Sequence, residues 1–141
     1  MNPVFFTDRD LGLTFPQILR DAGLTVERHA DHFAHNSPDE VWLRTAAERG
    51  WVALTHDARI RYKPNELAAI VEHAVKLLVI VGKAPYADLA RSFVATLGSI
   101  GQFLEAHPPP LIGKVYRPSA ADLLRNPAAP GRVERWYPKP E

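Results

Sequence analysis

Hydrophobic residues along the chain gather in four short runs that are typical of buried β-strands. The runs cover residues 3–7, 51–55, 76–82 and 110–116. Each is rich in Val, Ile, Leu or Phe and has little polar alternation, which is the pattern of strands covered by helices on both faces. A weaker fifth run, residues 24–29, alternates Val26 with charged neighbours and indicates an edge strand.

Helical patterns lie between these strands, at residues 15–23, 37–50, 63–74 and 85–107. The second is the clearest, because Ser37 and Glu40 have the spacing of a capping box and Gly50 follows the last turn. Alternation of strands and helices with short connections predicts an α/β fold, in which a mainly parallel sheet has helices on both faces.

The last part of the chain differs from the rest. Residues 1–116 have the pattern of one domain, whereas residues 117–141 hold five of the 13 prolines and a short helical stretch near residues 120–125. We expect a proline-rich tail that wraps the domain, pairs with a partner or stays disordered.

Composition limits the classes of function. The 141 residues include no cysteine, which excludes disulfides, thiolate zinc sites and a cysteine nucleophile. No apolar run approaches the ~20 residues of a membrane span and no secretory leader is visible, so we expect a cytoplasmic protein without a membrane partner. The net charge of +1 is small, and affinity for nucleic acid would need a local cluster of bases.

Acidic residues follow the predicted strands at the points where they end. Asp8 and Asp10 follow the first run, and Asp57 follows the run at 51–55. Asp39 and Glu40 fall in the first turn of the helix at 37–50. The carboxyl ends of parallel strands line one crevice, so we expect these carboxylates to meet there.

Carboxylates that share a crevice repel one another unless a cation lies between them. The hard cations Mg²⁺ and Mn²⁺ prefer such oxygen ligands and can promote attack on a phosphoryl group. Four nearby bases are candidates to contact the phosphates of a nucleic acid: Arg59, Arg61, Lys63 and Lys83.

Structural roles are open for several of these acids. Glu40 could serve only the capping box, Asp10 could turn the following loop, and Asp57 could cap a turn after its strand. His29, His32 and His35 are spaced three apart, which is typical of a surface loop at least as much as of a zinc site.

The stretches "FFTDRDLG" and "SPDEVWLRTAAERGWVALTHD" resemble the PIN-like nuclease domain, in the branch of the VapC-type toxins. In that family a strand ends on an aspartate, a helix then opens with an acid pair, and the next strand ends in Thr or Ser, a variable residue and Asp. The resemblance runs to about Gly82 and plausibly to Tyr116, so that the tail lies outside it.

This resemblance implies a three-layer α/β/α sandwich and a ribonuclease that depends on Mg²⁺ or Mn²⁺. It assigns Asp8, Asp39 and Asp57 to the catalytic metal site, with Glu40 as a substitute for Asp39 and Asp10 as an outer participant. It also implies an RNA substrate and a cognate antitoxin. Many relatives carry a fourth acid soon after the third, whereas Arg59 follows here.

Two other functions fit parts of the pattern. A receiver-like signalling domain would be phosphorylated on Asp57 and would use Lys83, although this lysine follows the wrong strand. A PIN-like interaction module would keep the fold with weak or no catalysis. A homodimer is a further expectation, if Trp42, Trp136 and Tyr137 are exposed.

Overall fold

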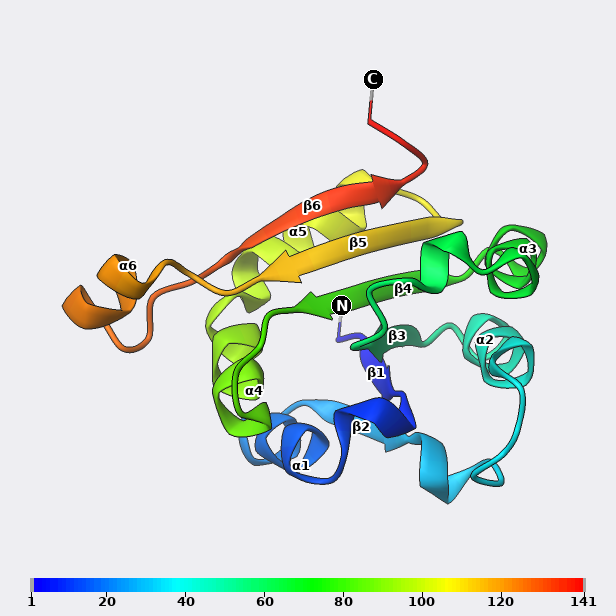
Figure 1. The fold of residues 1–141 in the computed structure, drawn as a ribbon, viewed down its shortest axis with the longest axis horizontal. Coiled ribbons are helices and arrows are strands. Elements are labelled where there is room, and N and C mark those ends of the chain that lie inside the picture. Colours follow the sequence, from blue (N-terminus) through cyan, green and yellow to red (C-terminus); the bar gives the residue numbers. More distant parts are fainter. Residues whose placement is uncertain (1, 141) are drawn as a thin grey trace.

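A six-stranded β-sheet runs through the middle of the protein in the order β2-β1-β3-β4-β5-β6 (Figure 1). The structure is a computed structural model that describes residues 2–140. The strands are β1 Val4–Thr7, β2 Thr25–Arg28, β3 Val52–Thr55, β4 Lys76–Val81, β5 Leu111–Tyr116 and β6 Arg132–Tyr137. The helices are α1 Thr14–Asp21, α2 Asp39–Glu48, α3 Pro64–His73, α4 Tyr86–Ala95, α5 Leu97–Ala106 and α6 Ala120–Arg125.

Strands β1 to β5 are all parallel to their neighbours, and β6 alone pairs antiparallel with β5. The predicted mainly parallel sheet is therefore confirmed, and β2 lies at an edge of the sheet as its alternating sequence indicates. Helices α1, α4 and α5 lie on one side and α2 and α3 on the other, which gives the expected three-layer α/β/α sandwich (Figure 1).

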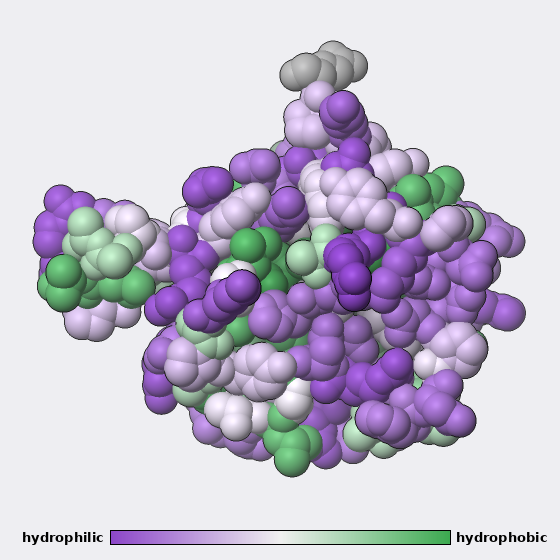
Figure 2. Space-filling model, in the orientation of Figure 1, coloured by the Kyte–Doolittle hydropathy of each residue, from purple (hydrophilic) through white to green (hydrophobic). Residues whose placement is uncertain are grey.

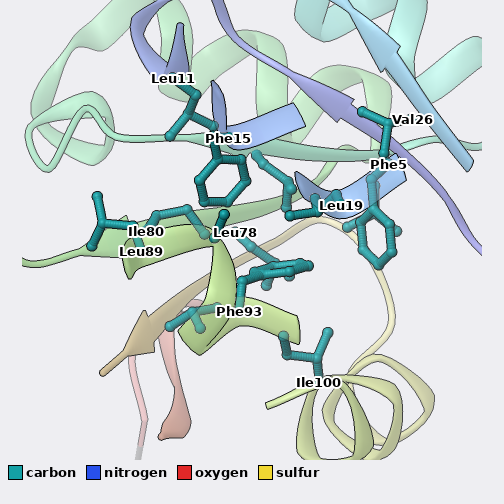
Figure 3. Packing of buried hydrophobic residues seen from close by; sticks show 14 of the residues in the cluster. Phe5, Leu11, Phe15, Leu19, Val26, Leu78, Ile80, Leu89, Phe93 and Ile100 are labelled. Carbon is teal, nitrogen blue, oxygen red and sulfur yellow. The ribbon is translucent and has the colours of Figure 1, made fainter. Parts of the chain in front are cut away.

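Adjacent residues of β1 point into the two different cores. Phe5 meets Phe93 of α4 edge to face, with ring centroids 5.3 Å apart (Figure 3 shows this core). Phe6 points to the opposite side and stacks on Trp42 of α2 and on Trp51, at 5.5 and 5.6 Å. Alternation along a strand thus fixes both helical layers to the sheet.

Trp42 corrects the sequence analysis, which treated this residue as exposed and as part of a dimer surface. Its side chain is 0% exposed and stacks on Phe6, so it is a core residue. Only Trp136 and Tyr137 of the three aromatic residues remain half-buried at the surface.

Two further local predictions are wrong. The predicted helix at 85–107 is two helices, because the chain leaves helical geometry at Thr96, whose hydroxyl lies 2.6 Å from the Ser92 carbonyl oxygen that it hydrogen-bonds. The predicted capping box is also absent: α2 begins at Asp39 after Pro38, which makes no side-chain cap.

Residues 117–140 contribute α6 and the edge strand β6. Tyr116 pairs with Arg132 and Lys114 pairs with Glu134 across β5 and β6. None of the helices formed by residues 2–140 has the length and apolar character needed to cross a membrane.

Candidate metal centre

The carboxyl ends of β1 and β3 meet in the middle of the sheet, where the strand order reverses. The chain passes from β1 outward to β2 and then returns across β1 to β3. In open α/β sheets, ligands bind in the crevice at such a reversal point. Asp8 follows β1 directly and Asp57 follows β3 by two residues, so both reach this crevice.

Asp8 is a buried carboxylic acid, with only 6% of the residue exposed. Its Oδ1 accepts a hydrogen bond of 2.7 Å from the backbone N–H of Arg9, and its Oδ2 lies 2.9 Å from Thr55 Oγ1. Burial, together with the negative charges of Asp10 and Asp39, raises the pKa of Asp8 to about 7. A cation beside this carboxyl would stabilise its charged form.

Thr55 joins the acids of the two strands. Its hydroxyl oxygen lies 2.9 Å from Asp8 Oδ2 and 3.2 Å from Asp10 Oδ2, and it also accepts a 3.2 Å hydrogen bond from the backbone N–H of Asp57. A hydroxyl has one hydrogen, so it can donate to only one of the two carboxylates. The other carboxylate needs a proton or a cation of its own, which agrees with the raised pKa of Asp8.

Asp10 is held in place by the backbone after β3. Both of its carboxylate oxygens face the backbone N–H of His56, at 3.2 and 3.1 Å, and its own carbonyl oxygen accepts a 2.7 Å hydrogen bond from Tyr86. Burial raises the pKa of Asp10, although the hydrogen bond from His56 lowers it in part. Asp10 thus has fixed partners on both sides of the crevice.

Asp57 is paired with a base. Lys63 Nζ donates a hydrogen bond to Oδ2, and the backbone N–H of Arg59 donates to Oδ1 at 3.0 Å. Burial alone would raise the pKa of Asp57, but the hydrogen bonds from Lys63 and Arg59 and their positive charges leave that pKa below its usual value. Asp57 is consequently ionised at neutral pH.

Asp39 reaches the crevice from the first turn of α2. Trp42 Nε1 donates a 3.0 Å hydrogen bond to Asp39 Oδ1, and the guanidinium of Arg9 lies 4.0 Å from the same oxygen. This contact holds the Asp39 carboxylate against a core tryptophan one turn further along the helix. Arg9 is too distant for a close ion pair.

The crevice is a cleft of about 310 Å³ whose lining brings the predicted aspartates together. The lining consists of Asp8, Arg9, Asp10, Asp39, Asp57, Arg59 and Lys63. Glu40 instead lines a groove between α2 and α3, beside Arg44 and His73. Among residues 2–140, Arg61 and Lys83 also lie outside this lining, and Lys83 is exposed after β4.

The cleft contains the kind of ligand atoms that a hard cation binds, but they are not arranged as a metal site. Its acids offer only carboxylate oxygens, the ligands that Mg²⁺ and Mn²⁺ prefer. Within residues 2–140, however, no three His, Cys, Asp or Glu side chains are arranged closely enough to hold an ion. At Asp57, Lys63 Nζ pairs with the carboxylate, so this acid already has a cationic partner.

Two residues of this region have no role in the sequence analysis. Glu66, in the first turn of α3, has its pKa raised by burial and by the charges of Asp39, Glu40 and Asp57, although the charge of Lys63 lowers it in part. The argument that finds Asp39, an acid in the first turn of the helix after a strand, would also have found Glu66. Arg9 also lines the cleft, and nothing in its sequence context indicates this.

Comparison with known proteins identifies the family. Residues 3–82 match the family model described as a PIN like domain. A protein of Mycobacterium tuberculosis (strain H37Rv) named "Putative ribonuclease VapC45" is 31% identical over 107 residues, which cover 69% of this chain and 75% of the relative. No solved structure matches the chain. The match covers β1 to β4 and all four aspartates of the cleft, and the chain therefore belongs to the PIN-like domain family.

Proposed function

We propose that this protein is a metal-dependent endoribonuclease that hydrolyses RNA phosphodiester bonds, and that it is the toxin of a toxin–antitoxin pair. The observation that carries the proposal is the buried Asp8 carboxyl, which shares one hydroxyl with Asp10 at the reversal point of a PIN-like sheet. Keeping an uncompensated carboxyl there costs stability, and a role in binding a cation explains why it is present.

Asp8, Asp39 and Asp57 are the proposed catalytic ligands of Mg²⁺ or Mn²⁺, with Asp10 as an outer acid. Glu40 lines the separate groove between α2 and α3, so it is not included in this set. A hard divalent cation supplies polarisation of a phosphoryl oxygen and a more acidic bound water. To join the set, Asp57 has to exchange the ammonium of Lys63 for the cation. Thr55 and Trp42 then position the Asp8 and Asp39 carboxylates through the hydrogen bonds that they already make.

The bases at the cleft contribute to substrate binding in this proposal. Lys63 and Arg59 flank Asp57 and line the cleft, so a released Lys63 is placed to contact a phosphate next to the bond that is cut. Arg61 and Lys83 lie outside the lining and would contact phosphates further along the strand.

The relative's name supports a ribonuclease over the two other functions considered. A receiver domain shares the strand order β2-β1-β3-β4-β5, so topology alone does not separate the two. Membership of the PIN-like family favours the nuclease, and the lysine that pairs with Asp57 is Lys63, not the Lys83 that a receiver domain would use. An antitoxin that covers the cleft and a cytoplasmic location, where both partners occur, complete the proposal.

The direct experiment is cleavage of a labelled single-stranded RNA by the purified protein with Mn²⁺, with Mg²⁺ and with EDTA. We expect cleavage only with a metal, and its loss in Asp57→Asn. Asp21→Asn, at the exposed end of α1, is the matched control and should cut like the wild type. If Asp57→Asn cuts at the wild-type rate while correctly folded, the site assignment is wrong.

A further inference from the structure

One face of the strands β5 and β6 lies open at the end of the sheet. Figure 1 shows α5 behind these strands and no helix over the side that faces the viewer, and Figure 2 shows hydrophilic and pale, intermediate residues over them. Lys114 and Tyr116 of β5 share this face with their cross-strand partners Glu134 and Arg132, and with Trp136.

Aromatic rings hold the bases of this face in place. Lys114 Nζ lies 4.0 Å from the centroid of the Trp136 ring, and the guanidinium carbon of Arg132 lies 4.0 Å from that of Tyr116. Such contacts order a cation without neutralising its charge, which a carboxylate would do. Lys114 therefore keeps its positive charge in a fixed place on this face, whereas Arg132 also lies 3.6 Å from the Glu134 carboxylate.

The same face continues into the segment that carries the candidate metal centre. Arg61 lies with its guanidinium carbon 5.4 Å from the Trp136 ring, and Tyr62 meets that ring edge to face at 5.6 Å. Arg61 and Tyr62 belong to the short segment between Asp57 and Lys63, both of which line the cleft. Trp136 thus joins the open face to the cleft.

Charge on this face favours an anionic partner. Within residues 2–140 neither Lys114 nor Arg61 forms an ion pair, and the one acid on the face, Glu134, lies 3.6 Å from Arg132. A chain with a net charge of only +1 has gathered three bases on one surface next to four aspartates. The aspartates repel phosphates, so attraction along the track compensates for that repulsion.

We propose that Arg61, Lys114, Tyr116, Arg132 and Trp136 form a binding track for single-stranded RNA that leads away from the cleft, and we call this surface the β5–β6 track. The proposal rests on the proposed ribonuclease function, because it names the path of that enzyme's substrate. Bases alternating with aromatic rings suit a single strand, whose phosphates contact the cations and whose bases stack on the rings.

The size of the track matches a short piece of RNA. A strand of six residues extends about 20 Å at 3.3 Å per residue. Successive nucleotides advance about 3.4 Å along a stacked duplex, and bases that leave the stack to lie on protein rings are spaced more widely, so the track accommodates at most about six nucleotides beyond the cleft. Residues 132–137 lie outside residues 3–82, the region that matches the PIN-like family model.

The test is RNA binding in EDTA, where cleavage does not interfere. Fluorescence anisotropy with a labelled 20-nucleotide oligouridine compares the wild type with Lys114→Gln/Arg132→Gln. The control is Arg44→Gln/Arg91→Gln, which removes the same charge from exposed sites on α2 and α4. We expect the track variant to bind about tenfold more weakly, and the slope of log affinity against log salt to fall by about 1.4, at 0.7 per lost phosphate contact.

Intrinsic fluorescence gives a second readout. Trp42 and Trp51 are 0% and 7% exposed, whereas Trp136 is half-buried on the track, so quenching by RNA reports mainly on Trp136. We expect Trp136→Phe, which keeps a ring on the track, to lose most of the quenching while it retains most of the affinity. Circular dichroism of each variant checks that it is folded.

Three results would contradict the proposal that the β5–β6 track binds RNA. They are a track variant that binds RNA as tightly as the wild type, a control that loses as much affinity, or poly-glutamate that binds the wild type more tightly than RNA does. Tighter binding of poly-glutamate would indicate that this face binds an acidic protein and not RNA. Failure of the ribonuclease proposal is seen separately, because it leaves every RNA uncut with Mn²⁺ while the binding measurement in EDTA is unaffected.

Discussion

Thr55 at the end of β3 and Asp8, directly after β1, touch across the middle of the sheet, with Oγ1 and Oδ2 2.9 Å apart in a buried contact. Thr55 also lies 3.2 Å from Asp10 and receives the backbone N–H of Asp57. The Thr55 hydroxyl therefore links the Asp8 and Asp10 carboxylates to each other and to the backbone at Asp57. These contacts hold the acidic residues at the two strand ends together.

Replacing Asp8 with asparagine is expected to abolish cleavage and to stabilise the metal-free protein at pH 8. The pKa of Asp8 is raised from 3.8 to about 7, so the folded state keeps its proton in a range where the unfolded state has lost it. The contribution of Asp8 to stability is complete below about pH 4 and is lost as the pH rises to about 7, up to about 4 kcal/mol. Urea unfolding in EDTA at pH 5 and pH 8 measures this difference.

The matched control for that experiment is Asp21→Asn, on the exposed end of α1, whose free energy of unfolding should change by less than about 0.5 kcal/mol at both pH values. If Asp8→Asn is less stable than the wild type at pH 8, the charged Asp8 carboxylate does not destabilise the folded protein, contrary to this prediction.

Replacing Thr55 with valine removes the hydroxyl but keeps the shape of the side chain. The backbone N–H of Asp57 and the Asp8 carboxylate then lose a partner, which should lower the free energy of unfolding by about 1–3 kcal/mol and reduce cleavage. Thr55→Ser should restore both. Thr25→Val, on the exposed edge strand β2, is the control; an equal loss in that variant would mean that β-strand context, not the hydroxyl, matters.

Replacing Lys63 with glutamine should have opposite effects on metal binding and on catalysis. The ammonium group competes with a cation for Asp57, so its removal should strengthen Mn²⁺ binding by about threefold to tenfold, corresponding to about 1 kcal/mol of charge repulsion. Cleavage should fall at least about tenfold because a phosphate contact is lost. Calorimetry and RNA cleavage are compared with Lys76→Gln, which lies at the opposite end of the sheet. Weaker Mn²⁺ binding in Lys63→Gln would contradict the proposal that the cation displaces the Lys63 ammonium from Asp57.

Glu66 is expected to act as a fourth acid of the site. Its raised pKa reflects burial and the charges of Asp39 and Asp57. Glu66→Gln should weaken Mn²⁺ binding and cleavage by about threefold to thirtyfold, equal to about 1–2 kcal/mol. Glu72→Gln, on the exposed side of the same helix, is the control and should leave both unchanged. If Glu66→Gln and Glu72→Gln have equal effects, Glu66 is not a part of the metal site.

Periodicity predicted most of the fold because the buried strands are continuous apolar runs. The five parallel strands lie within one or two residues of their expected ranges, and β2 lies at the sheet edge. Strand β6 was not expected, because its short sequence "RVERWY" carries three charges, has no continuous apolar run and lies between prolines. Its partner β5 and the aromatic contacts of Trp136, which no local pattern reveals, make it a strand.

A residue of the candidate site was predictable where its position at the end of a strand or the start of a helix is enough to bring it to the cleft. Asp8 and Asp57 follow parallel strands, and Asp39 opens a helix, so topology alone brings them to one cleft. The orientation of side chains was not predictable in this way. Glu40, adjacent to Asp39, lines a different groove because successive helical residues point about 100° apart, and Trp42 is buried because Phe6 needs a stacking partner.

The most direct test of the account is a calorimetric titration of Mn²⁺ into the wild type, Asp8→Asn and Asp57→Asn at pH 6.5, in two buffers of different ionisation heat. Because Asp8 is largely protonated there, the account predicts that the wild type binds Mn²⁺ with release of about one proton, and that both variants bind at least about tenfold more weakly. Binding that is equal in all three proteins, or binding without proton release, would contradict it.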